Sequence, residues 1–100
     1  METQMKFEQV LEPTYYNKGF FNVKVEFDRF IRNTNGPIAI QLGYGQYVVP
    51  GRVDRKANLN NTARIYGRTK LKNWFQSNFG LGQSIIVDIR APEHIVLLPK

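Results

Sequence analysis

The sequence contains no cysteine and a single histidine, His94, among its 100 residues. Without cysteine, the chain has no disulfides and no thiolate metal ligands. The lack of cysteine and the presence of only one histidine together exclude most metal sites and the usual Ser-His and Cys-His catalytic arrangements. We interpret His94 as a strand residue near a turn. We therefore expect no cofactor, no metal and no catalytic residue in this chain.

Long hydrophobic runs are also missing, and the apolar stretches are far shorter than a membrane span. The first residues combine no basic region with an apolar one, so we expect no secretion signal, no membrane association and a cytoplasmic protein. The content of 42 % hydrophobic and 13 % aromatic residues is typical of a folded globule. The length predicts a single domain over residues 1–100.

The positive charge is concentrated in one fifth of the chain. The formal net charge is +6, and residues 52–72 hold seven basic residues against one acid, Asp54. Outside that stretch, acidic and basic residues cancel. Charge segregated in this way predicts a polyanionic partner.

Patterns of apolar and polar side chains predict a mainly β fold with two short helices. Strands are expected over residues 7–11, 20–27, 38–42, 63–67, 84–89 and 94–98, and over 47–49 with a break at Pro50-Gly51 and resumption at Arg52. Helices are expected over 29–33, capped by Asp28, and over 69–79, capped by Thr69 and ended by a left-handed Gly80. Strands this short are best buried in a closed or nearly closed, mostly antiparallel barrel.

The stretch 52–64 has the chemistry of a DNA reader. Arginine can bond guanine in a bidentate way, asparagine can bond adenine, and aspartate can accept from cytosine, while lysine and threonine suit phosphates. A strand–loop–strand arm also fits the width of the major groove. The predicted base readers here are Arg52, Asp54, Arg55, Lys56, Asn58, Asn60, Asn61 and Arg64, with Thr62 at phosphate. The alternative is a solvated hairpin whose asparagines satisfy turn geometry.

Two further segments extend this surface. Adjacent tyrosines in an extended connection cannot both point inward, so we expect Tyr16 and Asn17 at bases and Tyr15 and Lys18 at phosphate. One core tyrosine and one surface tyrosine is the alternative. Basic residues at the start of the second helix, Arg68, Lys70 and Lys72, would hold phosphate with the help of its backbone amides. Simple solvation is the alternative for them.

Taken in order, these segments resemble the B3-like DNA-binding pseudobarrel of plant B3 transcription factors and of recognition or effector domains of type II restriction endonucleases. Residues 7–11, 14–20, 21–25 and 28–33 are similar to its first strand, N-arm, second strand and first helix. The most specific part is 63–87, with Trp74 and Phe75 on a helix before the turn Leu81-Gly82-Gln83. Gln83 replaces the aspartate that is common in the family, and the Leu–Gly spacing is shorter.

This resemblance implies a seven-stranded open pseudobarrel that binds double-stranded DNA with two arms in the major groove. The N-arm would be residues 15–18 and the C-arm 52–64. The restriction-enzyme branch is more similar, because the plant-type sequence around the second strand is missing. That branch implies a fused or associated nuclease domain as a partner.

Three other functions stay open. Asp54-Arg55-Lys56 fits half of a metal-dependent nuclease pattern, with Asp28 as the partner carboxylate. A protein-interaction barrel would bind an acidic partner on the same basic face. A binder of single-stranded nucleic acid would stack bases on tyrosines, among them Tyr44 and Tyr47.

Overall fold

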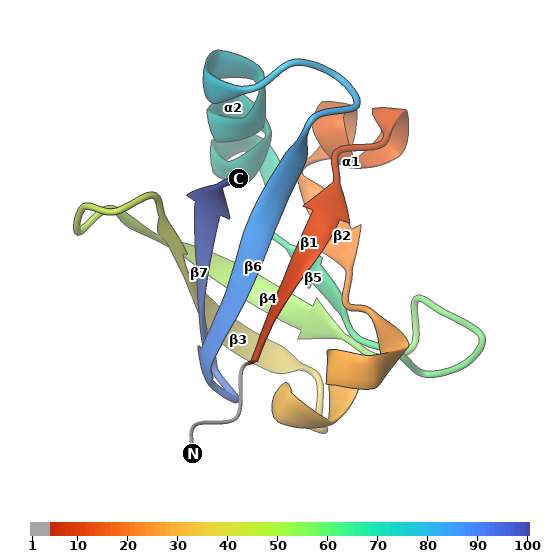
Figure 1. Cartoon of the computed structure of the whole chain (residues 1–100). Coiled ribbons are helices and arrows are strands. Elements are labelled where there is room, and N and C mark those ends of the chain that lie inside the picture. Colours follow the sequence, from red (N-terminus) through yellow and green to blue (C-terminus); the bar gives the residue numbers. More distant parts are fainter. Residues whose placement is uncertain (1–4) are drawn as a thin grey trace.

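The computed structural model describes residues 5–100, and in this part of the chain one seven-stranded mixed sheet curls into a half-barrel (Figure 1). The predicted mainly β, open pseudobarrel is confirmed. The strands are β1 (Lys6–Val10), β2 (Phe20–Asn22), β3 (Gly36–Leu42), β4 (Val48–Asp54), β5 (Arg64–Tyr66), β6 (Ser84–Ala91) and β7 (His94–Pro99). The helices are α1 (Pro13–Lys18), the 3₁₀ helix η1 (Val25–Phe30) and α2 (Arg68–Asn78).

The strand order is β1-β6-β7-β3-β4-β5-β2. All neighbours are antiparallel except β3 and β7, which run parallel. The barrel is open because β1 and β2 are the two edges of the sheet and do not pair with each other. They lie side by side across a gap that we call the seam (Figure 1).

Alternate residues of each strand fill the interior. Phe21 of β2, Val53 of β4 and Ile65 of β5 are fully buried, and they are direct or near neighbours in the strand register. Leu71 and Phe75 of α2 close one end of this core. The core continues across the other strands through Ile40, Val49, Ile85, Ile89, Ile95 and Leu97.

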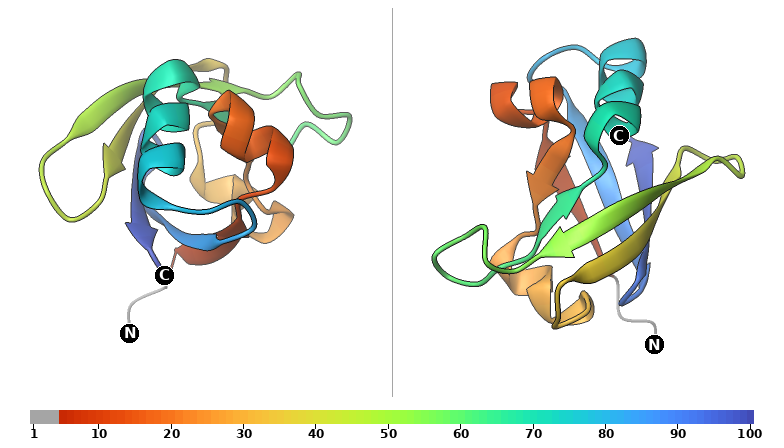
Figure 2. Two further views of the ribbon diagram at one scale, coloured as in Figure 1. Left: turned by 90° about the horizontal axis from the view of Figure 1, so that it is seen from above. Right: turned by 180° about the vertical axis from the view of Figure 1, so that it is seen from behind.

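Helices α1 and α2 lie together at one end of the barrel (Figure 2). They meet at Gly19, whose carbonyl accepts hydrogen bonds from the amides of Gly67 and Arg68, both at 2.9 Å. Gly19 has φ +72°, and a Cβ there would stand 2.1 Å from the Arg68 carbonyl oxygen. Only glycine permits both the left-handed backbone and this close approach.

Several local predictions are wrong. The expected strand 20–27 ends at Asn22 and gives way to η1, so that Val25 is exposed, while Phe27 packs on Phe7. Residues 13–18 form a helix that was not expected, although Pro13 at its first turn and a left-handed Gly19 at its end are ordinary helix signals. Three short helices are therefore present among residues 5–100 instead of two.

Strand β4 also runs unbroken through Pro50-Gly51. Pro50 pairs with Ala39 of β3, and β5 covers only residues 52–54 on the other side. The proline nitrogen therefore leaves no ladder bond missing. Gly80 is not left-handed, whereas Gly82 has φ +85°. Within residues 5–100, no helix is long and apolar enough to cross a membrane.

Candidate nucleic-acid interface

The outer face of strands β4, β5 and β2 carries two rows of polar and aromatic side chains. In the strand register, Arg52 lies opposite Tyr66, and Tyr66 lies opposite Phe20. The next row is formed in the same way by Asp54, Arg64 and Asn22. Since Val53, Ile65 and Phe21 point into the core, both rows lie on the outer side of the sheet, where Phe20 is buried beside Tyr15 and Tyr66.

Cations gather where the first row meets the two α-helices. Arg52, Tyr66, Arg68, Thr69 and Lys70 line a hollow of about 340 Å³ together with Pro50, Gly51 and Gly67. A second hollow of about 340 Å³ shares Tyr66, Arg68 and Thr69, and adds Asn17, Lys18, Phe20 and Lys72. We call this region the basic surface: Lys18, Arg52, Arg68, Lys70 and Lys72 around Tyr66 and Thr69.

Backbone geometry fixes the centre of the basic surface. Arg68 has φ +54°, which is uncommon for a residue with a side chain. Its amide is held by the Gly19 carbonyl, and its guanidinium lies 5.4 Å from the centre of the Tyr66 ring. The helices are further joined by a hydrogen bond that the Tyr16 hydroxyl donates to the Phe79 carbonyl at 2.9 Å. These contacts keep the cations of α1 and α2 on the same side of the molecule.

Residues 55–63 form a loop that projects from the barrel beyond β4 and β5 (Figure 2). Arg55 holds its base. The five N–H groups of this guanidinium donate to the Asp28 carboxylate at 2.7 Å and to the carbonyls of Asp28, Ile31, Arg32 and Asn61. The other carboxylate oxygen of Asp28 accepts from the Ala63 amide at 2.7 Å. Both ends of the loop are therefore fixed to η1.

A second network fixes the middle of the loop to the outer face. Asn58 donates to the side-chain oxygen of Asn22 at 3.0 Å and to the Thr62 carbonyl at 3.1 Å. Arg64 donates to the same Asn22 oxygen at 3.0 Å and to the Asn58 side chain at 3.2 Å, with its guanidinium 4.5 Å from the Phe20 ring centre. The loop is thus held by side chains from two strands.

Only part of the predicted site is free to bind a partner. Arg55, Asn58 and Arg64 are predicted to read bases, and in the structure their hydrogen-bonding groups hold the loop. Thr62, predicted to contact phosphate, is buried and bonds to Asn60. Tyr15, predicted at phosphate, is buried against Phe20, and Tyr16, predicted at a base, donates its hydroxyl to the Phe79 carbonyl.

The remaining predicted residues lie at the surface. Lys56, Asn60 and Asn61 are exposed on the loop, beside the fully exposed Leu59, and Asp54 is half-buried at its start. Asn17, Lys18, Arg52, Arg68 and Lys70 are exposed and Lys72 is half-buried. The structure therefore brings Lys18 together with Arg52 and the α2 cations, and leaves the loop as a separate projection.

Residues that the sequence did not single out complete the face. Tyr66, Phe20 and Asn22 form the outward rows with Arg52 and Arg64, and Thr69 lies in both hollows. A period of two along residues 64–66 places Arg64 and Tyr66 on one face, and this signal was available in the sequence. The pairing of β2 with β5 could not be read from the sequence, because it joins segments far apart in the chain.

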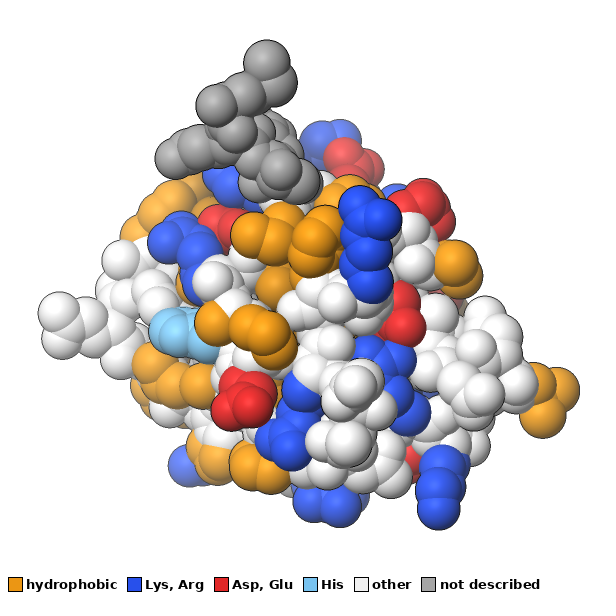
Figure 3. All heavy atoms as spheres, turned by 90° about the horizontal axis from the view of Figure 1, so that it is seen from below, with side chains coloured by type: hydrophobic (Ala, Val, Ile, Leu, Met, Phe, Trp, Pro, Cys, Tyr) orange, Lys and Arg blue, Asp and Glu red, His pale blue; other side chains and the backbone are white. Residues whose placement is uncertain are grey.

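Positive charge continues on the end of the molecule opposite the two α-helices. Figure 3 shows Lys and Arg side chains along the middle of that end, with isolated Asp and Glu side chains between them. Arg29 and Lys56 are exposed in this part of the chain, and Arg32 is half-buried. The base of loop 55–63 is therefore flanked by cations as well.

The geometry bears on two of the other functions. Asp28 binds Arg55 and the Ala63 amide, and the Asp54 carboxylate accepts from the Lys56 amide at 2.8 Å. Across residues 5–100, no three His, Asp or Glu side chains form a group that could hold a metal ion. Tyr44 and Tyr47 lie on the β3–β4 connection, which extends away from α1 (Figure 1). They therefore share no surface with Tyr15 and Tyr16 of α1.

No family model matches the chain, and no curated protein is similar to it in sequence. A functional proposal for this chain therefore depends on the side chains of the outer face of β4, β5 and β2.

Proposed function

We propose that this chain binds double-stranded DNA in a sequence-specific way. The observation that carries the proposal is the arrangement of the outer face of β4, β5 and β2, which has the basic surface on one side and the fixed loop 55–63 on the other. A basic surface and a projecting loop on either side of a polar sheet face would serve as the two arms in the major groove. A loop fixed before binding also avoids much of the entropy cost of ordering.

Phosphate and base contacts divide between the two sides. Lys18, Arg68, Lys70 and Lys72 would contact phosphates, because several cations around a hollow neutralise a sugar-phosphate backbone without reading its sequence. Asn61 and Lys56 on the exposed part of the loop would read base edges, with Arg52 from β4. Asn60, whose side-chain oxygen accepts from Thr62, would offer its amide nitrogen as a donor. Tyr16 and Asn17 would position the first arm, and Arg55, Asn58 and Arg64 would hold the second.

The wider assignment rests on the resemblance to B3-like domains. The residues that the resemblance assigns to the two arms lie in α1 before β2, and in β4 and the loop that follows it. We propose that the chain acts in the cytoplasm as the target-recognition or effector domain of a restriction endonuclease. It would itself have no active site, and a fused or associated nuclease domain would cut the DNA.

Competition between nucleic acids tests the proposal. The chain should bind a duplex more tightly than either of its single strands, and affinity should fall steeply with salt because counterions are released. Selection from a random pool of duplexes should then enrich one sequence. Equal binding to duplex and single strand would contradict the proposal, and a pool that stays random would remove its sequence-specific part.

An acidic protein is the second candidate partner. Val48 and Pro50 lie exposed beside Arg52 on β4 and line a mainly apolar hollow of about 380 Å³ with Pro37 and Ala39, and Glu93 is the one charged residue in its lining among residues 5–100. An apolar patch next to cations is typical of protein interfaces. Weak, sequence-independent binding of duplex together with tight binding of an acidic protein would favour this function.

A further inference from the structure

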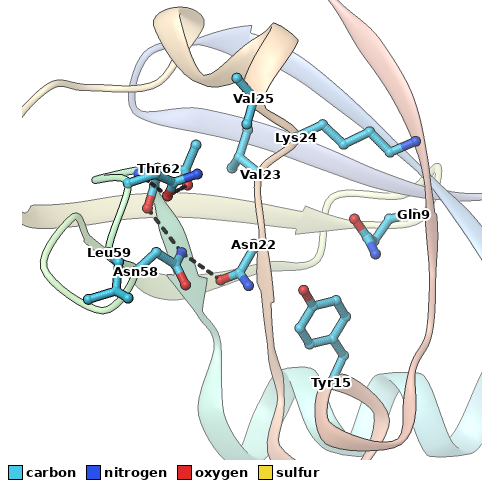
Figure 4. A pocket seen from close by; sticks show the side chains of 10 residues that line it. Gln9, Tyr15, Asn22, Val23, Lys24, Val25, Asn58, Leu59 and Thr62 are labelled. Atoms are coloured by element: carbon cyan, nitrogen blue, oxygen red, sulfur yellow. Dashed lines mark hydrogen bonds between the residues drawn. The ribbon is translucent and has the colours of Figure 1, made fainter.

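The seam between β1 and β2 opens into a hollow of about 600 Å³, of whose lining only Asn60 is among the proposed base contacts (Figure 4). It lies between α1 and loop 55–63, the two elements to which we assign the DNA-binding arms. Residues from each side of the seam line it: Gln9, Tyr15, Asn22, Val23, Lys24, Val25, Asn58, Leu59, Asn60 and Thr62. Volumes of this order are typical of small-molecule sites.

Two buried polar side chains face this space. Gln9 and Tyr15 are each 9 % exposed, and Figure 4 shows the amide of Gln9 and the hydroxyl of Tyr15 directed into the hollow. Among residues 5–100, the Tyr15 hydroxyl has no hydrogen-bond partner. Gln9 uses its amide nitrogen to bond the adjacent Val10 carbonyl at 3.0 Å, which leaves its oxygen as an acceptor. Both groups face the open hollow, so they are free to bond a ligand that enters it.

The rest of the lining combines apolar walls with uncharged polar groups. Val23, Val25 and Leu59 supply the apolar surface. Asn22 gives its side-chain oxygen to Asn58 and Arg64, so its amide nitrogen is left as a donor. No carboxylate lines the hollow, and Lys24 is its only cation within the described part of the chain. These groups suit a planar heterocycle with donors and acceptors on its edge, and the lysine suits an attached phosphate.

We propose that the seam hollow accepts one nucleobase displaced from the bound duplex, and this inference rests on the proposed function. A base rotated out of the stack needs a pocket next to the DNA that contacts its faces with apolar groups and its edge with hydrogen bonds. The hollow meets each condition and lies between the two arms. Tyr15 and Gln9 would bond the edge of the base, while Val25 and Leu59 would contact its face.

The test compares a fully paired duplex with the same duplex carrying one central mismatch, each labelled with 2-aminopurine at that position. An unpaired base costs less to displace. The whole chain should therefore bind the mismatched duplex at least about tenfold more tightly, and 2-aminopurine fluorescence should rise on binding because the base is unstacked.

Three variants make the test specific to the hollow. Val25 is 65 % exposed on its rim, so Val25→Trp should block the hollow without disturbing the core and should remove the preference for the mismatch. Val10→Trp, at an exposed position of β1 outside the lining, should retain it. Tyr15→Phe keeps the packing on Phe20 and should reduce the preference about fivefold, the value of one hydrogen bond.

The outcomes separate the two proposals. Salt-dependent duplex binding with no mismatch preference and unchanged fluorescence overturns the seam inference and leaves the proposed function standing. A preference that persists in Val25→Trp overturns it as well. Failure to bind either duplex contradicts the proposed function and the displaced base with it, and binding of free 2-aminopurine riboside would then show a pocket for free nucleobases.

Discussion

The carboxylate of Asp28 joins η1 to both ends of loop 55–63. One oxygen accepts from Arg55 at 2.7 Å, and the other accepts from the backbone amide of Ala63 at 2.7 Å. The two side chains are 23 % and 15 % exposed, so the ion pair is well shielded from water. Asp28, which the nuclease alternative assigns to a metal, and Arg55, predicted to read a base, together fix the position of loop 55–63.

Arg55→Ala is expected to lower the free energy of unfolding by about 2–3 kcal/mol, because it removes the bonds that Arg55 donates to the Asp28 carboxylate and to four backbone carbonyls. Urea unfolding measures this change. Arg52→Ala, at an exposed position of β4, should change unfolding by less than about 0.5 kcal/mol and should weaken duplex binding. The assignment fails if Arg55→Ala unfolds like the unaltered protein and loses selectivity at one base pair only.

Gly19→Ala should lower the free energy of unfolding by about 2 kcal/mol or more, because its methyl group would meet the Arg68 carbonyl in a backbone region that favours glycine. It should also weaken duplex binding, since the Gly19 carbonyl holds Arg68 in place. Gly45→Ala is the matched control, with no heavy atom within 4 Å of the added methyl. Equal thermal melting of the two variants would contradict this account of the contact between α1 and α2.

Lys70→Ala should weaken binding to all duplexes by a similar factor and lower the slope of log affinity against log salt by about one, as expected for one lost phosphate contact. Binding titrations at several salt concentrations measure the slope. Arg90→Ala removes the same charge from the β6–β7 end, where Arg90 pairs with Asp88 at 2.7 Å, and should leave the slope unchanged. An equal effect of the two variants would mean that net charge alone drives binding.

The hydrogen bond that Lys100 donates to Glu8 holds the pKa of this carboxyl below its usual range. A carboxyl with a lowered pKa in the folded state stabilises the fold above its unfolded pKa, and the contribution is lost as pH falls through the folded value. Lys100→Ala should raise the Glu8 pKa toward the ordinary value in an NMR titration. An unchanged pKa would mean that this ion pair does not persist in solution.

Local patterns in the sequence predicted much of the fold. Alternation and turn residues predicted β3, β5, β6, β7 and α2 with bounds close to those observed. The expected strand 20–27 failed because its alternation continued past the point where the chain turns into η1. Val25 fits the inward phase of a strand but is exposed, while Phe27 reaches Phe7 from a 3₁₀ helix. Tertiary packing overrode the local pattern there.

The candidate site was predicted only in outline. Composition alone located the basic stretch, and Arg52, Arg68 and Lys70 are exposed as expected. It could not separate them from Arg55 and Arg64, because the partners of those two arginines, Asp28 and Asn22, lie far away in sequence. The residue types indicated which side chains have the chemistry to bind DNA. The pairing of β2 with β5 and the contact with η1 determine which of them are free to contact a partner.

The most direct measurement is an NMR titration of the isotope-labelled chain with its selected duplex, following backbone and side-chain amide signals. The account predicts that the largest shifts fall on two groups, Lys18 with Arg52 and residues 66–70, and the loop amides of Lys56, Asn60 and Asn61. Signals of Tyr44 and Tyr47 on the far hairpin should stay in place. Shifts centred on that hairpin, or no shifts with duplex at low salt, would contradict the account.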